Sequence, residues 1–154
     1  MRAKLLLADS AEVREGLLFL LGAGWTDVGP GPQPFAIAGI IEVDWGETNA
    51  SHPIEFVLED EDGNPLLIPT PAGDVPLRIG TTFEVGRPAG TRGGSFNVPL
   101  ALPLSPVPWM PGRRYVLKVT IDGVEVDRLR FSVRAAPESR APSPPGPTAP
   151  PGRD

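Results

Sequence analysis

Residues 35–45 read FAIAGIIEVDW, and this stretch decides the fold class of the chain. Apolar or small side chains occupy its odd positions: Phe35, Ile37, Gly39, Ile41, Val43 and Trp45. Successive side chains of a β-strand point to opposite faces, so a period of two predicts a strand with one buried face. The same alternation returns at residues 77–85 and 115–121, and no stretch shows a helical period. The sequence therefore predicts an all-β protein.

Further apolar runs extend this prediction to eight or nine short strands. They are residues 3–8, 17–25, 54–59, 66–68, 96–104 and 124–133. In residues 17–25, the side chains Leu17, Phe19, Leu21 and Trp25 share one apolar face, which we assign to the core. Pro99 and Pro103 cannot donate to a ladder, so residues 96–104 should form an edge strand or a broken strand. Strands with one apolar face to cover favour an antiparallel β-sandwich.

An immunoglobulin-like Greek key is the favoured topology. Tyr115 stands at the start of a late strand, where immunoglobulin-like domains place a tyrosine whose hydroxyl bonds to nearby backbone. Asp122-Gly123 lies between two alternating runs and predicts a two-residue hairpin, because both turn positions need positive φ. The parity of the apolar residues then slips, which predicts a β-bulge near Asp127-Arg128.

Length and composition set limits on organisation. The chain has 154 residues, which suits one domain over residues 1–134. Residues 135–154 are rich in proline and hold no large apolar residue, so we predict a disordered tail with polyproline-II character. Cysteine is absent, which excludes disulfides, thiolate metal sites and thiol nucleophiles.

Net charge and the absence of a targeting signal limit which classes of partner and which location we expect. The formal net charge is −5 and there is no basic stripe, so nucleic-acid binding is disfavoured. The first apolar run, residues 5–8, is too short for a secretory signal or a membrane span. We therefore expect a cytoplasmic protein without membrane or nucleic-acid partners.

Catalytic and metal-binding patterns are weak. His52 is the only histidine and stands in a loop next to Pro53, so we interpret it as a surface residue. Residues 60–64, Asp-Glu-Asp-Gly-Asn, resemble the start of a calcium loop but lack its later glutamate, which favours a hairpin turn. Glu42 and Asp44 share the outer face of their strand and read as solvated charges. We predict no cofactor and no metal.

The three tryptophans are the remaining candidates for function. Trp25 and Trp45 have the parity of core residues. Trp109 lies between prolines in a predicted loop, where its ring either caps the core, the favoured interpretation, or anchors a partner. The candidate interaction surface consists of Trp109, Met110, Arg87 and Arg92.

Four stretches stand out beyond the strand pattern: the opening LLLADSAEV at residues 5–13, LLGAGW at residues 20–25, residues 55–64 and FEVGRP at residues 83–88. These stretches carry a resemblance to a family of short bacterial proteins classed as a domain of unknown function. It covers most of residues 3–133 and excludes the tail. It implies a compact, non-exported β-domain, and it carries no functional residue to this sequence.

Three function hypotheses follow, in order. The first is a non-catalytic interaction module that contacts another protein through loops or a sheet face, since a rigid scaffold with long Pro/Gly loops suits binding. The second is a domain that binds a small ligand or carbohydrate, with Trp109 or Trp25 as a stacking platform. An enzyme is third, because no catalytic apparatus can be assembled from these residues.

Overall fold

The computed structural model of the chain describes residues 1–87, 89–90 and 93–135. This part is all-β, as predicted, and its one helical element is a single turn of 3-10 helix, η1 (Trp45–Glu47). The strands are β1 (Arg2–Ala8), β2 (Ser10–Arg14), β3 (Leu17–Leu21), β4 (Asp27–Val28), β5 (Gly31–Asp44), β6 (Ser51–Asp60), β7 (Leu67–Thr70), β8 (Gly73–Pro76), β9 (Arg78–Glu84), β10 (Ser95–Trp109), β11 (Arg114–Ile121) and β12 (Val124–Val133). The predicted tail lies outside the described residues from residue 136 onward.

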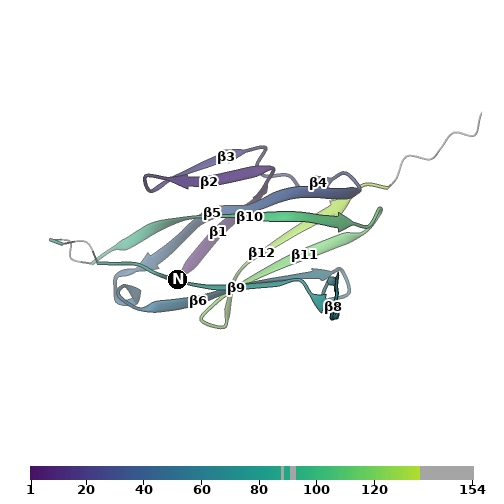
Figure 1. Cartoon of the computed structure of the whole chain (residues 1–154). Coiled ribbons are helices and arrows are strands. Elements are labelled where there is room, and N and C mark those ends of the chain that lie inside the picture. Colours follow the sequence, from purple (N-terminus) through teal and green to yellow (C-terminus); the bar gives the residue numbers. More distant parts are fainter. Residues whose placement is uncertain (88, 91–92, 136–154) are drawn as a thin grey trace, which may run out of the picture.

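Two sheets enclose one hydrophobic core. One has the strand order β1-β5-β10 and the other β4-β12-β11-β6-β9. Figure 1 shows β5 and β10 above β6 and β9, with the β2–β3 hairpin lying above β5 and β10. The core takes fully buried side chains from both sheets, among them Ile37 and Val43 of β5, Phe56 of β6 and Val119 of β11. The period-two residues of 35–43 thus face the core as predicted.

The outer face of β5 is covered as well, which one-sided alternation did not predict. Ala36 and Ala38 are 0% exposed although they point away from the core. The β2–β3 hairpin packs over β5 and β10 on this side. Small side chains allow two layers to approach closely, so the alanines of β5 make room for the hairpin.

Strand directions and edges follow the sequence prediction with one exception. All assigned strand pairs are antiparallel except β4 with β12, which run parallel over two residues. β10, with its prolines, stands at the edge of its sheet as predicted. Its parity shifts between Leu104 and Val107, where the register with β5 is irregular.

The β11–β12 hairpin confirms the predicted turn and bulge. Asp122 and Gly123 have φ values of 53° and 76°, as a type I′ turn requires. Thr120 pairs with Glu125 and Val119 with Asp127, so Val126 is the extra residue of the bulge. A residue next to the bulge also connects the two sheets, because the Leu5 N–H of β1 donates to Asp127 Oδ2 of β12 at 2.8 Å.

We expect Gly123→Val to lower the free energy of unfolding by about 1–2 kcal/mol. A Cβ on Gly123 would meet nothing within 4 Å, so the cost arises from positive φ on a β-branched residue and not from a clash. Denaturant unfolding measures it, with Gly123→Asn as the control that tolerates positive φ. Equal midpoints for the two variants and wild type would contradict the turn.

Residues 17–25 differ most from the prediction. The strand ends at Leu21, and residues 17–21 form β3 of a separate hairpin with β2, which the sequence analysis did not predict. Leu17, Phe19 and Leu21 do share one face, but this face points to solvent, so the core assignment is wrong. Trp25 lies outside any strand and is partly buried, packed against the core.

Candidate interaction surface

Trp109 is a core residue and not part of a surface. It ends β10, is 2% exposed, and therefore does not lie in a loop. Its ring centroid lies 5.4 Å from that of Phe35, 5.3 Å from Tyr115 and 5.1 Å from Phe131. The core interpretation of Trp109 is confirmed, and no partner can reach its ring in this conformation.

Met110 follows Trp109 and is exposed, with 56% of its surface accessible. Its backbone N–H donates to the Tyr115 hydroxyl at 3.3 Å. This is the predicted contact of a strand-start tyrosine with nearby backbone. It fixes the connection between β10 and β11 and leaves the Met110 side chain in solvent.

Arg87 is engaged with its own chain. Its guanidinium lies over the Trp45 ring, 4.2 Å from the centroid, and Nε donates to Thr48 Oγ1 at 3.0 Å. Trp45 itself begins η1 and is half-buried, so the prediction that it sits on the core face of a strand is wrong. A guanidinium held in this way is less available to a partner. Arg92, the fourth predicted surface residue, lies outside the described residues.

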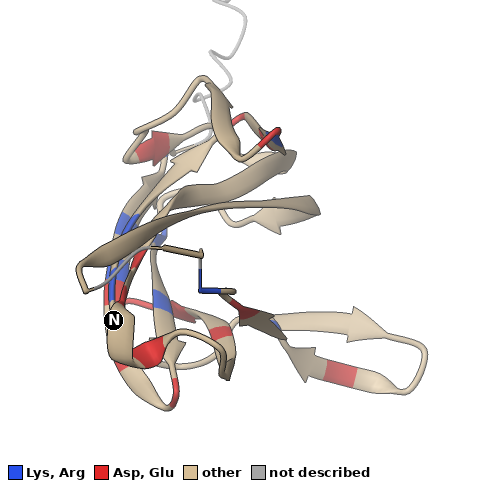
Figure 2. Cartoon of the chain, turned by 90° about the vertical axis from the view of Figure 1, so that its left-hand side faces the viewer, with Lys and Arg blue, Asp and Glu red and all other residues tan. Residues whose placement is uncertain are grey.

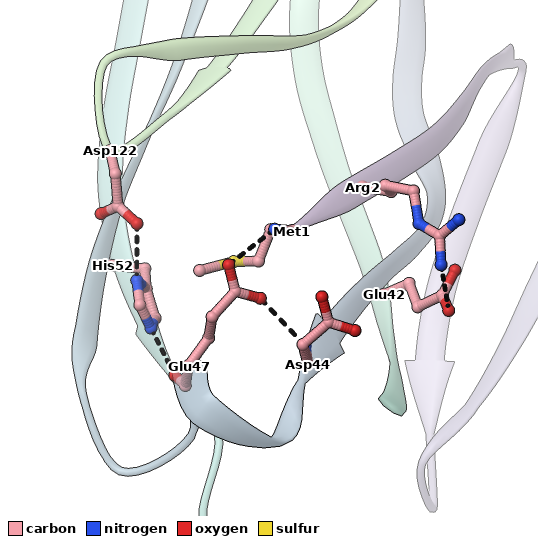
Figure 3. Close-up of polar contacts among 7 residues, drawn as sticks. All are labelled: Met1, Arg2, Glu42, Asp44, Glu47, His52 and Asp122. Carbon is pink, nitrogen blue, oxygen red and sulfur yellow. Dashed lines mark hydrogen bonds and ion pairs between the residues drawn. The ribbon is translucent and has the colours of Figure 1, made fainter. Parts of the chain in front are cut away.

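His52 sits in a polar network at the end of the molecule near η1 (Figure 3). It is 7% exposed and belongs to β6, so the prediction of a surface loop histidine is wrong. Its Nδ1 lies 2.8 Å from Asp122 Oδ2, and its Nε2 lies 2.7 Å from the Glu47 carbonyl oxygen. Figure 3 shows the ring between the β11–β12 turn and η1.

Both partners of the His52 ring are acceptors, so both ring nitrogens must donate. The geometry therefore fits the charged imidazolium. Burial works against this charge, but the hydrogen bonds to the Glu47 carbonyl and to Asp122 outweigh it and raise the pKa of His52 above its usual value. A histidine whose two nitrogens are both occupied links three segments of chain and has no free nitrogen for acid–base catalysis.

The raised pKa predicts a pH dependence of stability. The contribution of His52 is complete below its unfolded-state pKa of about 6.5 and is lost as the pH rises through the folded-state value. We expect the free energy of unfolding to fall as the pH is raised from about 6 through the raised pKa of His52, more steeply in wild type than in His52→Gln. Denaturant unfolding across this range measures both slopes. Parallel pH profiles would show that His52 does not carry the effect.

The acidic candidates are engaged in local contacts. Glu42 Oε1 lies 2.8 Å from Arg2 Nη2 and accepts from Ser95 Oγ at 2.9 Å. They line a polar cavity of about 500 Å³ over β1, β5 and β10. Asp44 instead precedes η1, where its N–H donates to Glu47 Oε2 at 2.9 Å. Glu42 is therefore neutralised by a cation, which is not the environment that raises the pKa of a catalytic acid.

The acidic turn at residues 60–64 is a hairpin turn, as favoured. Gly63 has a φ of 84°, and Asp60 Oδ1 accepts from the N–H groups of Asp62 at 3.0 Å and Asn64 at 2.8 Å. These hydrogen bonds, above all from the Asn64 side chain, hold the pKa of Asp60 below its usual value. Over the described ranges no group of three or more His, Cys, Asp or Glu residues is placed to hold a metal ion.

Exposed apolar side chains gather on the β2–β3 hairpin. Ten large apolar side chains are exposed in the part of the chain that the structure describes, and five of them lie on this hairpin. They are Val13, Leu17, Phe19, Leu20 and Leu21. An exposed apolar patch on a folded domain marks an interaction site. This hairpin is thus the strongest candidate site.

The outward face of the hairpin consists of two rows. Leu17, Phe19 and Leu21 of β3 are 62%, 48% and 70% exposed. Their register partners on β2 are polar or charged: Arg14, Glu12 and Ser10. Arg14 and Glu12 pair with each other at 2.8 Å, and the Arg14 guanidinium lies over the Phe19 ring, 5.9 Å from its centroid. An apolar row beside a charged row resembles the apolar centre and polar rim of protein–protein interfaces.

Charges elsewhere on the molecule are mixed. Figure 2 shows Lys and Arg beside Asp and Glu near the N-terminus, where Arg2 pairs with Glu42. In the described residues, no helix is long and apolar enough to cross a membrane.

The chain was compared with models of known protein families. A family model described as "Family of unknown function (DUF6941)" matches residues 4–134. The chain belongs to this family. The match confirms the resemblance to a family of unknown function, and it covers both core sheets and the β2–β3 hairpin of this DUF6941 member. No curated protein matches the chain.

The β2–β3 hairpin of this DUF6941 chain was not predicted, although the sequence holds one signal for it. Glu15-Gly16 separates Val13 from the apolar run at residue 17, and the two turn residues have φ values of 52° and 75°. They form a turn of the same kind as Asp122-Gly123. An acidic residue before glycine, directly ahead of the apolar run at residue 17, could have predicted this hairpin turn.

Proposed function

We propose that this DUF6941 chain is a non-catalytic protein-interaction module, and that the outward face of the β2–β3 hairpin is its binding surface. One observation carries the proposal: Leu17, Phe19 and Leu21 form a continuous exposed apolar row on a hairpin that packs on the sheet beneath it. Removing apolar surface from water contributes about 25 cal/mol per Å², so a partner that covers this row gains directly.

The immunoglobulin-like topology belongs to the same proposal. The Tyr115 hydroxyl that accepts from the Met110 N–H, and two sheets around one core, support it. In such scaffolds a rigid double layer supports a variable binding element at its surface. Here the added element is the hairpin between β1 and β4.

The second hypothesis, ligand stacking on tryptophan, has less support. Trp109 is buried, and the Trp25 ring packs edge-on against Phe35 and Phe131. Trp45 is covered by Arg87. A sugar-binding platform needs an open ring face, so these contacts favour the protein-interaction module over a carbohydrate-binding domain. An enzyme remains third, since His52 has both ring nitrogens engaged.

A matched pull-down tests the proposal. The tagged chain is used as bait for native lysate and for a second, differently tagged copy of the chain, and recovered proteins are quantified by mass spectrometry. We expect wild type to recover a specific partner and the triple variant Leu17→Ser, Phe19→Ser, Leu21→Ser to recover at least tenfold less of it.

The control substitutes serine for exposed apolar residues outside the hairpin. Met110 and Val124 are 56% and 65% exposed and lie outside the hairpin, so Met110→Ser with Val124→Ser should retain the partner. If the hairpin variant recovers the same proteins as wild type, the hairpin is not the binding surface.

A further inference from the structure

We infer that the partner of the β2–β3 hairpin is a second copy of this chain, joined by antiparallel pairing of β3 with β3 of the other copy. This inference rests on the proposed function and names the partner of the same surface. The observation behind it is that β3 reads Leu-Leu-Phe-Leu-Leu, a palindrome centred on Phe19. A two-fold axis through Phe19 then places leucine against leucine and phenylalanine against phenylalanine along the whole strand.

A symmetric dimer needs such self-complementarity. In a two-fold interface residue i of one copy contacts residue j of the other, and j contacts i. Antiparallel pairing centred on Phe19 sets Phe19 against Phe19, Leu18 against Leu20, and Leu17 against Leu21 of the second copy. Every pair is apolar, and the strand holds no charge and no proline to prevent edge pairing.

The backbone of β3 is also free to pair. In the described residues β3 pairs with β2 alone, so its other edge has no partner strand. Arg14 and Leu17 flank the two-residue turn and therefore exchange both backbone hydrogen bonds, as do alternate pairs along the hairpin. This alternation directs the N–H and C=O groups of Leu18 and Leu20 to the free edge.

The side-chain pattern agrees with that edge. If Leu18 and Leu20 form the hydrogen-bonded pair across the axis, Phe19 faces Phe19 at a non-hydrogen-bonded position, where side chains lie closest. The result is one four-stranded sheet with the order β2-β3-β3-β2. Its outward face has an apolar centre of Leu17, Phe19 and Leu21 from both copies.

Charge is compatible with a second copy. Glu12 and Arg14 lie on the outer strands of this sheet and pair within their own copy at 2.8 Å. No unpaired charge is buried, and no like charges meet at the centre. Because Glu12 and Arg14 neutralise each other, a strongly charged partner would gain no unpaired charge on this face, whereas the uncharged, self-matching row of β3 fits its own copy.

The small apolar area that β3 exposes favours a reversible dimer. The exposed fractions of Leu17, Phe19, Leu20 and Leu21 are 62%, 48%, 39% and 70%. With about 200 Å² for a large side chain, they expose on the order of 400 Å² per copy, and edge pairing covers only the part of it that faces the axis, so the contact is less than half of a standard interface. The dimer should therefore form in a concentration-dependent way.

Sedimentation velocity and site-specific cross-linking test the inference on the full chain. We expect the mass to rise from that of one chain, 16.3 kDa, toward that of two as the concentration increases. Because the natural chain has no cysteine, one introduced thiol reports one register. Phe19→Cys should form a disulfide-linked dimer under mild oxidation, since this position lies against itself across the axis.

The register gives a matched control. Leu17→Cys alone and Leu21→Cys alone should not cross-link, because like positions lie about 13 Å apart, whereas a mixture of the two variants should. Wild type that stays at the mass of one chain at all concentrations would overturn the inference. So would open-ended oligomers, or cross-linking of Leu17→Cys alone as efficiently as the mixture.

The two proposals fail separately. A monomer in sedimentation whose lysate partner is lost in the Leu17, Phe19 and Leu21 triple variant overturns only the dimer, and shows that a different protein covers the hairpin. A hairpin variant that keeps both its mass and its lysate partners overturns the proposed surface itself.

Discussion

Gly39→Ala should lower the free energy of unfolding by about 4 kcal/mol, or prevent folding altogether. Gly39 lies in β5 opposite Leu5 of β1, and a Cβ there would stand 2.1 Å from the Lys4 carbonyl oxygen and 2.8 Å from the Leu5 Cα. Both are backbone atoms of a paired strand, so neither can move aside without breaking the ladder. The change would separate β1 from the sheet that supports the hairpin.

A second glycine provides the control for Gly39→Ala. Gly80 lies in β9, where a Cβ would meet nothing within 4 Å. Gly80→Ala should be neutral or slightly stabilising, because alanine loses less conformational entropy on folding. Guanidinium unfolding of the two variants measures the difference. Equal midpoints would mean that β1 and β5 do not approach as closely as described.

Trp109→Ala should lower the free energy of unfolding by about 3–5 kcal/mol. Trp109 lies within 5.5 Å, centroid to centroid, of three aromatic rings from three strands: Phe35, Tyr115 and Phe131. Removing the indole leaves a cavity between the two sheets that rigid neighbours cannot fill. Thermal and denaturant unfolding give the measurement.

The neighbouring residue separates a core role from a surface role. Met110→Ala removes an exposed side chain and should change stability by less than about 0.5 kcal/mol. If Trp109→Ala were as mild as Met110→Ala, Trp109 would have to be a surface residue, and the tryptophan-based binding hypothesis would return.

The sequence predicted the strands that have one buried face. Residues 54–58 and 115–121 alternate because the facing sheet covers only one side of them, and their buried residues are those expected from parity. In residues 35–43 the expected parity is buried too, but Ala36 and Ala38 on the other face are covered by the β2–β3 hairpin, which parity did not predict. The Asp122-Gly123 turn and the bulge after it were also predictable, since each has a local backbone requirement. Turns and bulges can be predicted from the sequence when neighbouring residues alone determine their backbone conformation.

The same rules could not predict the candidate site. Alternation shows that Leu17, Phe19 and Leu21 share a face, but it does not show which side of the molecule that face meets. Trp109 was placed in a loop because of its prolines, and the irregular register between Leu104 and Val107 changed which parity is buried. The His52–Asp122 contact joins residues 70 positions apart, which only the tertiary fold brings together.

Amide hydrogen exchange of β3 is the most direct test of the interaction surface. The exchange of residues 17–21 is compared between the dilute, isolated chain and the chain bound to the partner recovered in the pull-down, with the Asp122-Gly123 turn as internal reference. We predict that Leu18 and Leu20 exchange at least tenfold more slowly in the bound state while the reference turn is unchanged. Equal exchange of β3 in both states, with the partner demonstrably bound, would contradict the account.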